Sequence, residues 1–509
     1  MMEELAKVVE KFAQFELMVE PDAAKLLCKY TQEELESIAS LFQNKDVLIV
    51  TKTLVEEVVG VGAGEKVGDE EYGRADEEYG KEEECRGEYE EEIEEEIEEN
   101  QSIRKEVVIN VVYSMNNLKS TGSYEGFLSY FRSRYSKLVS LISDRISPRP
   151  ISSLRKIGTS DDVWIAGLVS DKRTTRSGHV IIELEDESGV MPVLIPKNSC
   201  DVVNEILPDE MIGVRGHLNG EKKLFIATDV IFPDIPEKRY QKKLIEQNGG
   251  YVVLTSDMHV GSIHFLEGAW NRFVRWLNCD VGDTKTKRMA RNVSCILVCG
   301  DLVDGIGIYP KQETELSIDN IFEQYKALAE YIEDIPAHIK IVMCPGNHDI
   351  VRQAEPQPPL SENIQKFFDD RVIFVGNPSL IDVNGTRILM YHGRSLNDLI
   401  PTLGLSYERP AEAMCRMLIK RHLAPMYGST VPIAPEPEDH LVIEEIPDVL
   451  HTGHVHVVDY MNYKGVKLIN SGTWQSQTEY QKMKNLKPTP AKVPVLDTSS
   501  LKIAMLNFK

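Results

Sequence analysis

Cysteine is scarce in this sequence and is nowhere arranged as a Cys-x-x-Cys pair. The chain has 509 residues and 8 cysteines with no Cys-x-x-Cys motif, at Cys28, Cys85, Cys200, Cys279, Cys295, Cys299, Cys344 and Cys415. This spacing excludes a disulfide framework and a zinc ribbon. Cys295, Cys299 and Cys344 lie in apolar runs, where we expect each free thiol to act as a small apolar side chain.

Long hydrophobic runs are also missing. No stretch approaches the roughly 20 consecutive apolar residues that would span a bilayer. The first residues, MMEELAKVVEKF, lack the basic start and apolar centre of a signal peptide. We therefore expect a cytoplasmic protein with no membrane partner.

Positive charge is in deficit, but most of the deficit comes from one segment. The formal net charge is −24, and residues 65–100 hold 19 acidic and 4 basic residues, which leaves 62 acidic and 53 basic residues elsewhere. The remaining chain is only mildly acidic, so its charge does not exclude DNA as a partner. The acidic segment has too little apolar surface to offset the entropy cost of ordering, and we expect a disordered linker at 56–105.

Helical periodicity flanks this linker. Leu5, Val8, Val9 and Phe12 repeat at i, i+3, i+4 and i+7, which predicts a helical N-terminal domain over 1–55. Residues 123–144 return to a helical period, so we expect 106–150 to form a helical connector.

Short strand-like runs characterise residues 151–240. Five runs rich in Val and Ile are broken by Gly, Ser or Asp, and they read DVWIAGLVSDKRTT, GHVIIELEDESG, VMPVLIP, MIGVRGHLNG and KLFIATDVIF. In the second run Val180, Ile182 and Leu184 alternate with a more polar face. Five such strands predict an oligonucleotide-binding (OB) type barrel. A barrel of this kind can bind DNA or dock a protein, and the sequence leaves both uses open.

Residue types that bind metals follow several apolar runs in the last half of the chain. Apolar runs alternate there with helical segments, which predicts an α/β sandwich domain over 250–485 and a separate C-terminal segment at 486–509. The clusters are Asp257-Met258-His259, Gly300-Asp301, Gly346-Asn347-His348-Asp349, His392-Gly393 and His451-Thr452-Gly453-His454-Val455-His456.

Five of the 12 histidines belong to these clusters as candidate metal or catalytic residues. Imidazole and carboxylate groups together suit Mn, Fe, Zn or Co. One Asp-x-His or Gly-Asn-His alone is more often a cap or a turn, whereas five clusters together predict a metal site. The histidines expected to be structural are His264, His338, His422 and His451.

The order of the five clusters resembles that of the calcineurin-like metallophosphoesterase superfamily, which includes phosphatases and repair nucleases. The resemblance implies two divalent metal ions, with manganese favoured and iron, cobalt or zinc also compatible. Asp257, His259 and His456 would hold the first ion and Asn347, His392 and His454 the second. Asp301 would bridge the two ions.

Two further residues acquire roles from the same resemblance. His348 would be the general acid at the leaving oxygen, and Asp304 resembles the carboxylate that orients it. In the phosphatase branch an Asp-Arg pair grips a phosphomonoester, but here Asp304 is followed by Gly305-Ile306-Gly307. This departure favours a phosphodiester substrate.

The whole chain resembles the small subunits of the archaeal family D DNA polymerase. The resemblance is carried by STGSYEGFLSYFRSRY, LVSDKRTTRSGHVIIELED, SDMHVGS, GDLVDGIGIYP, PGNHD, YHGRS, RHLAPMYGST, HTGHVH, INSGTWQSQT and QKMKNLKPTPAKVPV. It implies a multidomain α+β protein with an N-terminal helical domain, a five-stranded OB-type β-barrel and an α/β metallophosphoesterase sandwich. Such a subunit pairs with a large polymerising subunit and acts as a 3'-to-5' exonuclease on the primer 3' end, and a sliding clamp is a further candidate partner.

Two other functions fit parts of the sequence. A freestanding phosphodiesterase or repair nuclease has the same metal set but does not need the barrel. A non-catalytic scaffold subunit needs the barrel but is expected to have lost its metal ligands. Basic candidates for contacting DNA phosphates are Lys285, Lys287, Arg288, Arg291, Arg394, Arg416, Lys420 and Arg421, although most such residues lie on solvated helix faces.

Overall fold

The computed structural model describes residues 107–120, 122–156, 158–159, 161–197, 201–236 and 250–509, together with scattered positions in the first 50 residues. The chain divides into two compact units, Met1–Ile103 and Arg104–Lys509. In the first unit β1 (Met18–Val19) pairs in parallel with β2 (Ile49–Val50). Most of the helical domain predicted at 1–55, and the linker predicted at 56–105, lie outside the described residues.

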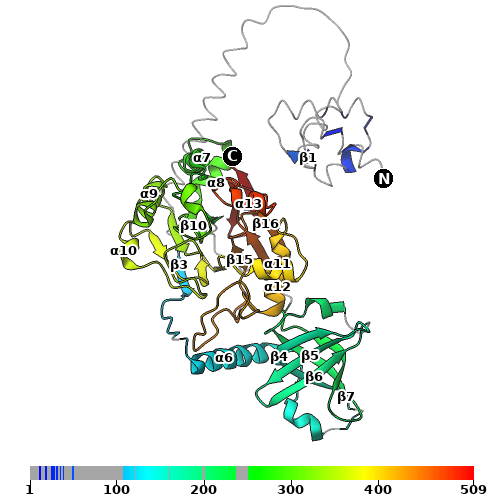
Figure 1. The fold of residues 1–509 in the computed structure, drawn as a ribbon. Helices are drawn as coiled ribbons and strands as arrows, with labels where there is room; N and C mark the ends of the chain where they lie inside the picture. The colour runs from blue at the N-terminus through cyan, green and yellow to red at the C-terminus, as the bar shows by residue number, and fades with distance from the viewer. Residues whose placement is uncertain are drawn as a thin grey trace, which may run out of the picture. The chain divides into compact units, whose positions relative to one another are not determined.

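Two six-stranded sheets form a sandwich in the second unit (Figure 1). The first sheet has the order β12 (Val372–Phe374), β11 (Lys340–Cys344), β10 (Val293–Cys299), β9 (Tyr251–Thr255), β18 (Lys492–Asp497) and β19 (Ile503–Asn507). The second has the order β16 (Asp459–Tyr463), β17 (Val466–Asn470), β15 (Val449–Thr452), β14 (Thr386–Met390), β13 (Ser379–Val383) and β3 (Ile109–Tyr113).

Apolar side chains fill the space between the two sheets. Val252 of the first sheet and Met390 of the second belong to one buried cluster. Cys295, Cys299 and Cys344 lie in the same cluster as free thiols, which confirms that they act as apolar side chains. Strands buried on both faces explain why the sequence shows continuous apolar runs here rather than alternation.

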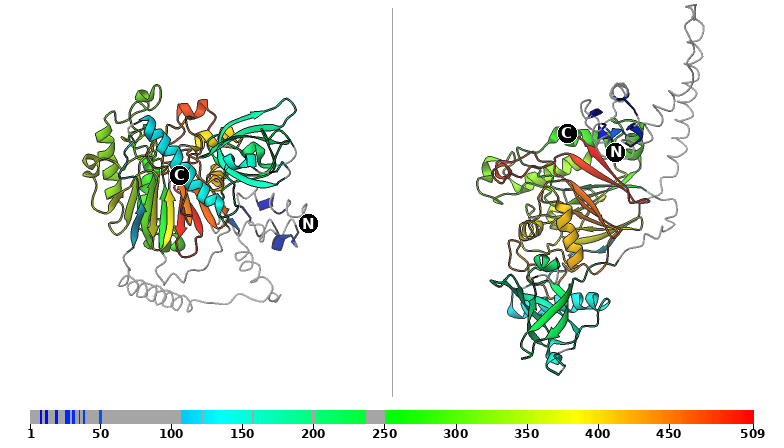
Figure 2. Two further views of the ribbon diagram at one scale, coloured as in Figure 1. Left: turned by 90° about the horizontal axis from the view of Figure 1, so that it is seen from below. Right: turned by 90° about the vertical axis from the view of Figure 1, so that its right-hand side faces the viewer.

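Helices cover the outer faces of both sheets, as the two turned views in Figure 2 also show. The first sheet is covered by α7 (Glu267–Leu277), α8 (Thr284–Arg291) and α9 (Ile321–Glu333). The second is covered by α11 (Leu396–Thr402) and α12 (Pro410–Lys420). The loops contain the short helices α10 (Glu362–Gln365), α13 (Glu479–Met483) and the 3-10 helix η3 (Gln312–Thr314).

The five runs predicted as strands form a closed barrel. Its order is β4 (Val163–Thr174), β5 (Val180–Asp186), β6 (Gly189–Ile195), β8 (Phe225–Ile231) and β7 (Met211–Leu218), with the 3-10 helices η1 (Ile151–Lys156) and η2 (Asp201–Glu205) beside it. Val180, Ile182 and Leu184 are buried while Glu183 and Glu185 are exposed. The alternation in the sequence therefore identifies correctly which side chains of this strand are buried.

Two segments differ from the arrangement that the sequence predicts. The connector at 106–150 is not wholly helical, because β3 pairs antiparallel with β13 before α6 (Tyr124–Ser143) begins. The C-terminal segment at 486–509 is not separate, because its strand β18 pairs with β9 in the first sheet. Both strands are short and their partners are distant in the sequence, so local periodicity does not reveal them.

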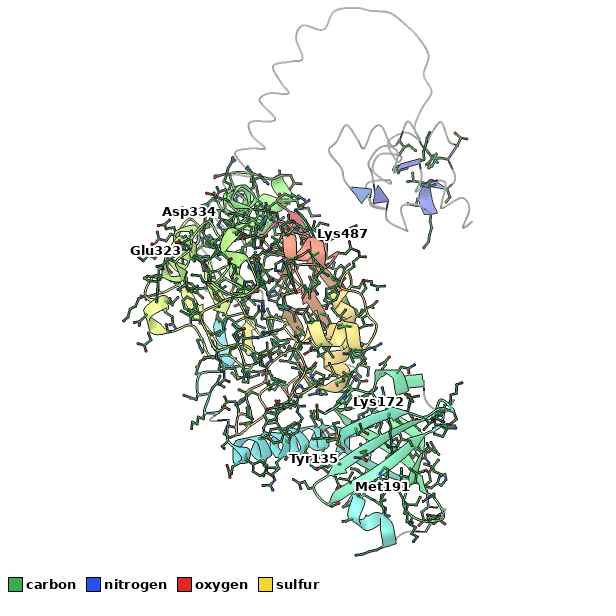
Figure 3. The ribbon with its side chains drawn as sticks, viewed as in Figure 1. Tyr135, Lys172, Met191, Glu323, Asp334 and Lys487 are labelled. Carbon is green, nitrogen blue, oxygen red and sulfur yellow. The ribbon has the colours of Figure 1, made fainter. Side chains whose placement is uncertain are left out.

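α6 connects the barrel to the sandwich within the second unit. It begins at Ser123, whose hydroxyl accepts a hydrogen bond from the Gly126 amide (3.1 Å). Arg134 is fully buried and donates its Nε to Asp439 Oδ2 (2.7 Å). Tyr135, labelled in Figure 3, packs against a buried cluster that includes the barrel residues Ala166 and Met211.

Among the residues that the structure describes, no helix is both long and apolar enough to cross a membrane.

Candidate metal centre

The residues with metal-binding side chains gather where five strands of the sandwich end. β9, β10 and β11 are parallel neighbours in the first sheet, and β14 and β15 are parallel in the second. Because the carboxyl ends of parallel strands meet at one edge of a sheet, the loops that follow them lie together. These loops carry Asp257, His259, Asp301, Asp304, Asn347, His348, His392, His454 and His456. His348 and His454 are half-buried and the others are buried.

The first group of candidate ligands consists of Asp257, His259 and His456. His456 Nε2 lies 3.3 Å from Asp257 Oδ1 and 3.0 Å from His259 Nε2. The lone pairs of two imidazole nitrogens this close repel each other unless a proton or another cation lies between them. One ligand atom from each residue lies within 4.8 Å of the other two, which suits a single metal ion.

The second group surrounds Asp301. His392 Nε2 lies 3.3 Å from Asp301 Oδ2, 3.2 Å from Asn347 Oδ1 and 3.3 Å from His454 Nδ1. The other ring nitrogen, His392 Nδ1, lies 2.9 Å from the Cys299 carbonyl oxygen and can donate to it, which directs Nε2 into the group. Asp301 Oδ2 is also 3.8 Å from His259 Nε2, so this carboxylate lies between the two groups.

Charge attraction overrides burial at Asp301 and His392. Burial alone would raise the pKa of Asp301, but His392 and His348 hold it well below its usual range. Burial lowers the pKa of His392, but the Asp301 carboxylate reverses the effect and raises it to about 10. Protonated imidazole therefore balances the carboxylates in the metal-free protein. Metal ions would replace these protons, because metal ligands must be deprotonated.

Glycines leave the space that this arrangement needs. A Cβ atom built on Gly346 would overlap Asp301 Oδ1, and one on Gly300 would overlap the His392 ring. A Cβ on Gly453 would collide with Asp257 Oδ2. The glycines in these motifs are thus required by close approach of the ligand side chains.

Five of the candidate ligands themselves have a left-handed backbone. Positive φ angles of 49° to 71° occur at Asp257, His259, Asp301, His454 and His456. This conformation costs about 1–2 kcal/mol per non-glycine residue. Strain of this kind is concentrated at functional sites, where it aims side chains that a regular strand would point apart.

His348 lies next to the ligands, beside His259 and Asp304. Its Nδ1 lies 2.7 Å from the Asp304 carbonyl oxygen, and its Nε2 lies 3.9 Å from Asp301 Oδ2. The Asp304 carboxylate lies 3.1 Å from His259 Nδ1 instead. The structure therefore differs from the prediction that the Asp304 side chain orients His348, because the main-chain carbonyl contacts His348 while the carboxylate contacts His259.

Two glutamines that the sequence analysis does not identify hold Asp304 in place. Gln475 Nε2 donates to Asp304 Oδ1 (3.0 Å), and Gln312 Nε2 donates to Oδ2 (2.9 Å). Gln475 belongs to the quoted segment INSGTWQSQT and lies 171 residues beyond Asp304. A single glutamine carries no spacing signal, so only the fold associates it with this site.

Three other polar residues support the loops around the centre. Asp349 Oδ2 accepts hydrogen bonds from the amides of Gly346 (2.8 Å) and Leu302 (3.2 Å). Gln481 Nε2 lies 2.8 Å from His456 Nδ1, and Asn397 Nδ2 lies 2.7 Å from His454 Nε2. These contacts limit how far the ligand rings can turn.

The candidate DNA-contacting residues fall into different environments. Lys420 and Arg421 are buried, and Lys420 Nζ lies 2.5 Å from Glu210 Oε2 while Arg421 Nε donates to the Ile443 carbonyl. Arg416 pairs with Glu205 (3.0 Å). Lys420 and Arg421 are therefore neither exposed for contact with DNA phosphates nor on a solvated helix face. Lys285, Lys287, Arg288 and Arg291 lie on α8, and half-buried Arg394 donates to the Gln353 carbonyl.

Three of the four histidines expected to be structural contact neighbouring polar side chains. His451 is buried with Nε2 3.0 Å from Ser471 Oγ. His422 Nε2 lies 2.9 Å from Asp439 Oδ2, the same oxygen that accepts from Arg134 of α6. His264 is half-buried at 3.8 Å from Glu315.

Comparison with known proteins identifies the family. The family model for the B subunits of DNA polymerases alpha and epsilon matches residues 252–457, and that of an OB-fold nucleic acid binding domain matches residues 163–224. The DNA polymerase II small subunit of Archaeoglobus fulgidus is 38% identical over 495 residues, which cover 96% of this chain and 95% of the relative. The chain belongs to the family of DNA polymerase II small subunits.

Other DNA polymerase II small subunits are similar to about three quarters of this chain. That of Methanothermobacter thermautotrophicus is 45% identical over 397 residues, covering 76% of this chain and 80% of the relative. That of Halobacterium salinarum is 41% identical over 396 residues, covering 76% of each. The resemblance to the small subunits of the archaeal family D polymerase is thereby confirmed.

Proposed function

We propose that this small subunit is a metal-dependent 3'-to-5' exodeoxyribonuclease that acts within a heteromeric DNA polymerase. One observation carries the proposal: the seven side chains of the expected ligand set converge from five strand ends, with His348 beside them. All eight positions retain residues competent for metal binding or proton transfer.

The ligands divide between two ions. Asp257, His259 and His456 would hold one divalent ion, and Asn347, His392 and His454 the other. Asp301, which lies between the groups, would bridge them. Such ions supply positive charge that stabilises developing phosphoryl oxygens and activates water. Manganese fits this oxygen and nitrogen ligand set, and iron, cobalt and zinc fit it as well.

His348 would be the general acid. If its Nδ1 donates to the Asp304 carbonyl, the protonated ring presents Nε2–H toward the centre. In the proposed hydrolysis, a bond forms between water oxygen and phosphorus while the bond from phosphorus to the 3' oxygen breaks. His348 gives its proton to that leaving oxygen, as a general acid does.

The loop after Asp304 supports a diester substrate. Gly305, Ile306 and Gly307 offer no basic side chain where the phosphatase branch has an arginine. A doubly charged phosphomonoester would lack that partner here. A DNA phosphodiester carries a single charge and fits better.

The subunit would act with a large polymerising subunit that delivers the primer 3' end. The barrel and the sandwich would form the docking platform, with a sliding clamp as a further candidate partner. A scaffold without catalysis is the second candidate function, because the buried contacts of Arg134 and Lys420 connect α6, the barrel and the sandwich as a docking module requires.

The test is digestion of 3'-labelled and 5'-labelled single-stranded DNA with Mn²⁺, with and without the large subunit. We expect stepwise shortening from the 3' end. His348→Ala should lower kcat by about 10²–10⁴-fold, the usual effect of losing a general acid. Asp301→Ala should abolish activity together with metal binding. His217→Ala on β7 of the barrel is the matched control and should retain full activity.

The opposite result is equally informative. A wild-type complex that digests no DNA with Mn²⁺, Fe²⁺, Co²⁺ or Zn²⁺ would contradict the nuclease function and favour the scaffold. Full activity of the small subunit alone, without any gain from the large one, would favour a freestanding nuclease.

A further inference from the structure

Tyr309 lies beside His348 of the candidate metal centre, and Tyr480 lies beside Tyr309. The Tyr309 ring centroid lies 6.3 Å from the His348 ring and 6.1 Å from the Tyr480 ring. The two tyrosine rings are inclined by only 31°. Tyr309 donates its hydroxyl to Glu315 Oε2 (2.9 Å), which fixes its ring, while Tyr480 is 44% exposed.

The short helix α13 attaches Tyr480 to the metal centre. A capping box starts this helix, with the Thr478 hydroxyl accepting from the Gln481 amide (3.2 Å) and Gln481 Oε1 accepting from the Thr478 amide (3.1 Å). The same Gln481 side chain contacts the candidate ligand His456. Tyr480 is therefore held beside the centre by its neighbour in the chain.

Apolar side chains are exposed in the same loops. Ile306 lies two residues after Asp304, and Ile350 lies two residues after His348, and both are exposed. Met483 at the end of α13 is 78% exposed. These exposed apolar side chains thus lie within two or three residues of Asp304, His348 and Tyr480, and exposed apolar surface of this kind is typical of a binding site.

Cations accompany these apolar and aromatic groups. Lys484 Nζ lies 5.9 Å from the Tyr480 ring centroid, and Lys487, labelled in Figure 3, follows it on the exposed turn after α13. Both belong to the segment QKMKNLKPTPAKVPV, to which the metal chemistry assigns no role. Aromatic faces with neighbouring cations are the usual means of holding unpaired nucleotides.

We propose that Tyr480, backed by Tyr309, is a stacking platform for the unpaired base of the 3'-terminal nucleotide, and that Lys484 and Lys487 contact the phosphates of the same strand. This proposal rests on the proposed exonuclease function. A base can stack on Tyr480 only after it has left its partner strand. The platform therefore makes the centre select frayed or mismatched ends.

The platform predicts a particular kinetic effect. Loss of base stacking on one aromatic ring weakens binding by about 5- to 150-fold. Tyr480→Ala in the complete polymerase should therefore raise KM by about this factor for single-stranded and 3'-mismatched DNA, with little change in kcat. Tyr480→Phe keeps the ring and should behave as wild type.

A substrate without the terminal base separates stacking from general damage. With an oligonucleotide that ends in an abasic residue, wild type and Tyr480→Ala should have the same KM. Tyr124→Ala, at an exposed tyrosine of α6, is the matched control and should leave both substrates unaffected. Equal effects of Tyr480→Ala on normal and abasic ends, or no effect on either, would overturn the proposal.

Binding without cleavage distinguishes failure of this proposal from failure of the nuclease function. We would measure fluorescence anisotropy of 3'-labelled DNA with His348→Ala and with His348→Ala/Tyr480→Ala. Lower affinity of the double variant for normal ends only would support the platform even if wild type cleaves no DNA. A Tyr480→Ala variant that loses the large subunit, while its own DNA affinity is unchanged, would assign this surface to the subunit interface and overturn the proposal.

Discussion

At the scale of single residues, the buried carboxylate of Asp439 contacts both Arg134 of α6 and His422. Asp439 Oδ2 accepts from Arg134 Nε (2.7 Å) and lies 2.9 Å from His422 Nε2. The pKa of His422 is lowered to about 4, mainly by burial and secondly by the positive charge of Arg134, whereas the Asp439 carboxylate acts to raise it. His422 is therefore neutral in the folded protein at neutral pH, and Arg134 provides the charge that balances Asp439.

This arrangement predicts a pH dependence of stability. A histidine with a folded pKa near 4 contributes stability fully above its unfolded pKa of about 6.5, and this contribution is lost as pH falls through its folded pKa. The loss amounts to about 3 kcal/mol at most, since each pKa unit is worth about 1.4 kcal/mol. We expect the thermal midpoint of the metal-free protein to fall between pH 7 and pH 4, and His422→Gln to flatten that fall.

The control for this prediction is His217 on β7, a histidine that is not among the Arg134, Asp439 and His422 contacts. His217→Ala should leave the pH profile of the thermal midpoint unchanged. A His422→Gln profile as steep as that of wild type would show that other groups carry the dependence.

At the scale of elements, α12 is held to the barrel by a buried ion pair. Lys420 Nζ lies 2.5 Å from Glu210 Oε2 and 2.7 Å from the Glu205 carbonyl, and it stands 4.2 Å from the Phe232 ring centroid. Glu210 Oε1 accepts from the Leu207 amide (2.8 Å). Both charges are buried, so neither can be solvated if its partner is removed.

Removing one of the two charges should therefore destabilise the folded protein more than removing both. Lys420→Met leaves the buried Glu210 carboxylate without its paired ammonium group and should destabilise the protein by roughly 3–5 kcal/mol. Adding Glu210→Gln, which keeps an acceptor for the Leu207 amide, should restore most of that loss. Thermal midpoints and limited proteolysis of the three proteins measure the effect, and equal loss in the single and double variants would contradict it.

At the scale of the whole molecule, the candidate metal centre is formed by loops from both sheets of the sandwich. Asp257, His259 and Asp301 follow strands of the first sheet, whereas His392 and His456 follow strands of the second. An ion held by both sets would bind the folded protein and not the unfolded chain. Metal binding should therefore stabilise the sandwich as a unit.

Manganese is expected to raise the thermal midpoint progressively as its concentration rises. Each occupied site adds about 2.7 kcal/mol when the free ion is about 100-fold above its Kd. Asp301→Asn, at the carboxylate between the two groups, should reduce this shift strongly, and excess chelator should reverse it in wild type. His217→Ala should retain the full shift, and a shift of wild-type size in Asp301→Asn would contradict the assignment of the centre.

The sequence alone determined the elements and motifs that depend on neighbouring residues. The alternation in Val180, Ile182 and Leu184 reports a barrel strand because side chains of a strand alternate between two faces. The ligand clusters are recognisable because each follows a buried strand directly. Only the tertiary structure decided the pairing of β3 and β18, the burial of Lys420 and the partner of the Asp304 carboxylate. These features depend on contacts between distant segments, and local periodicity specifies which face of an element is buried but not what lies against it.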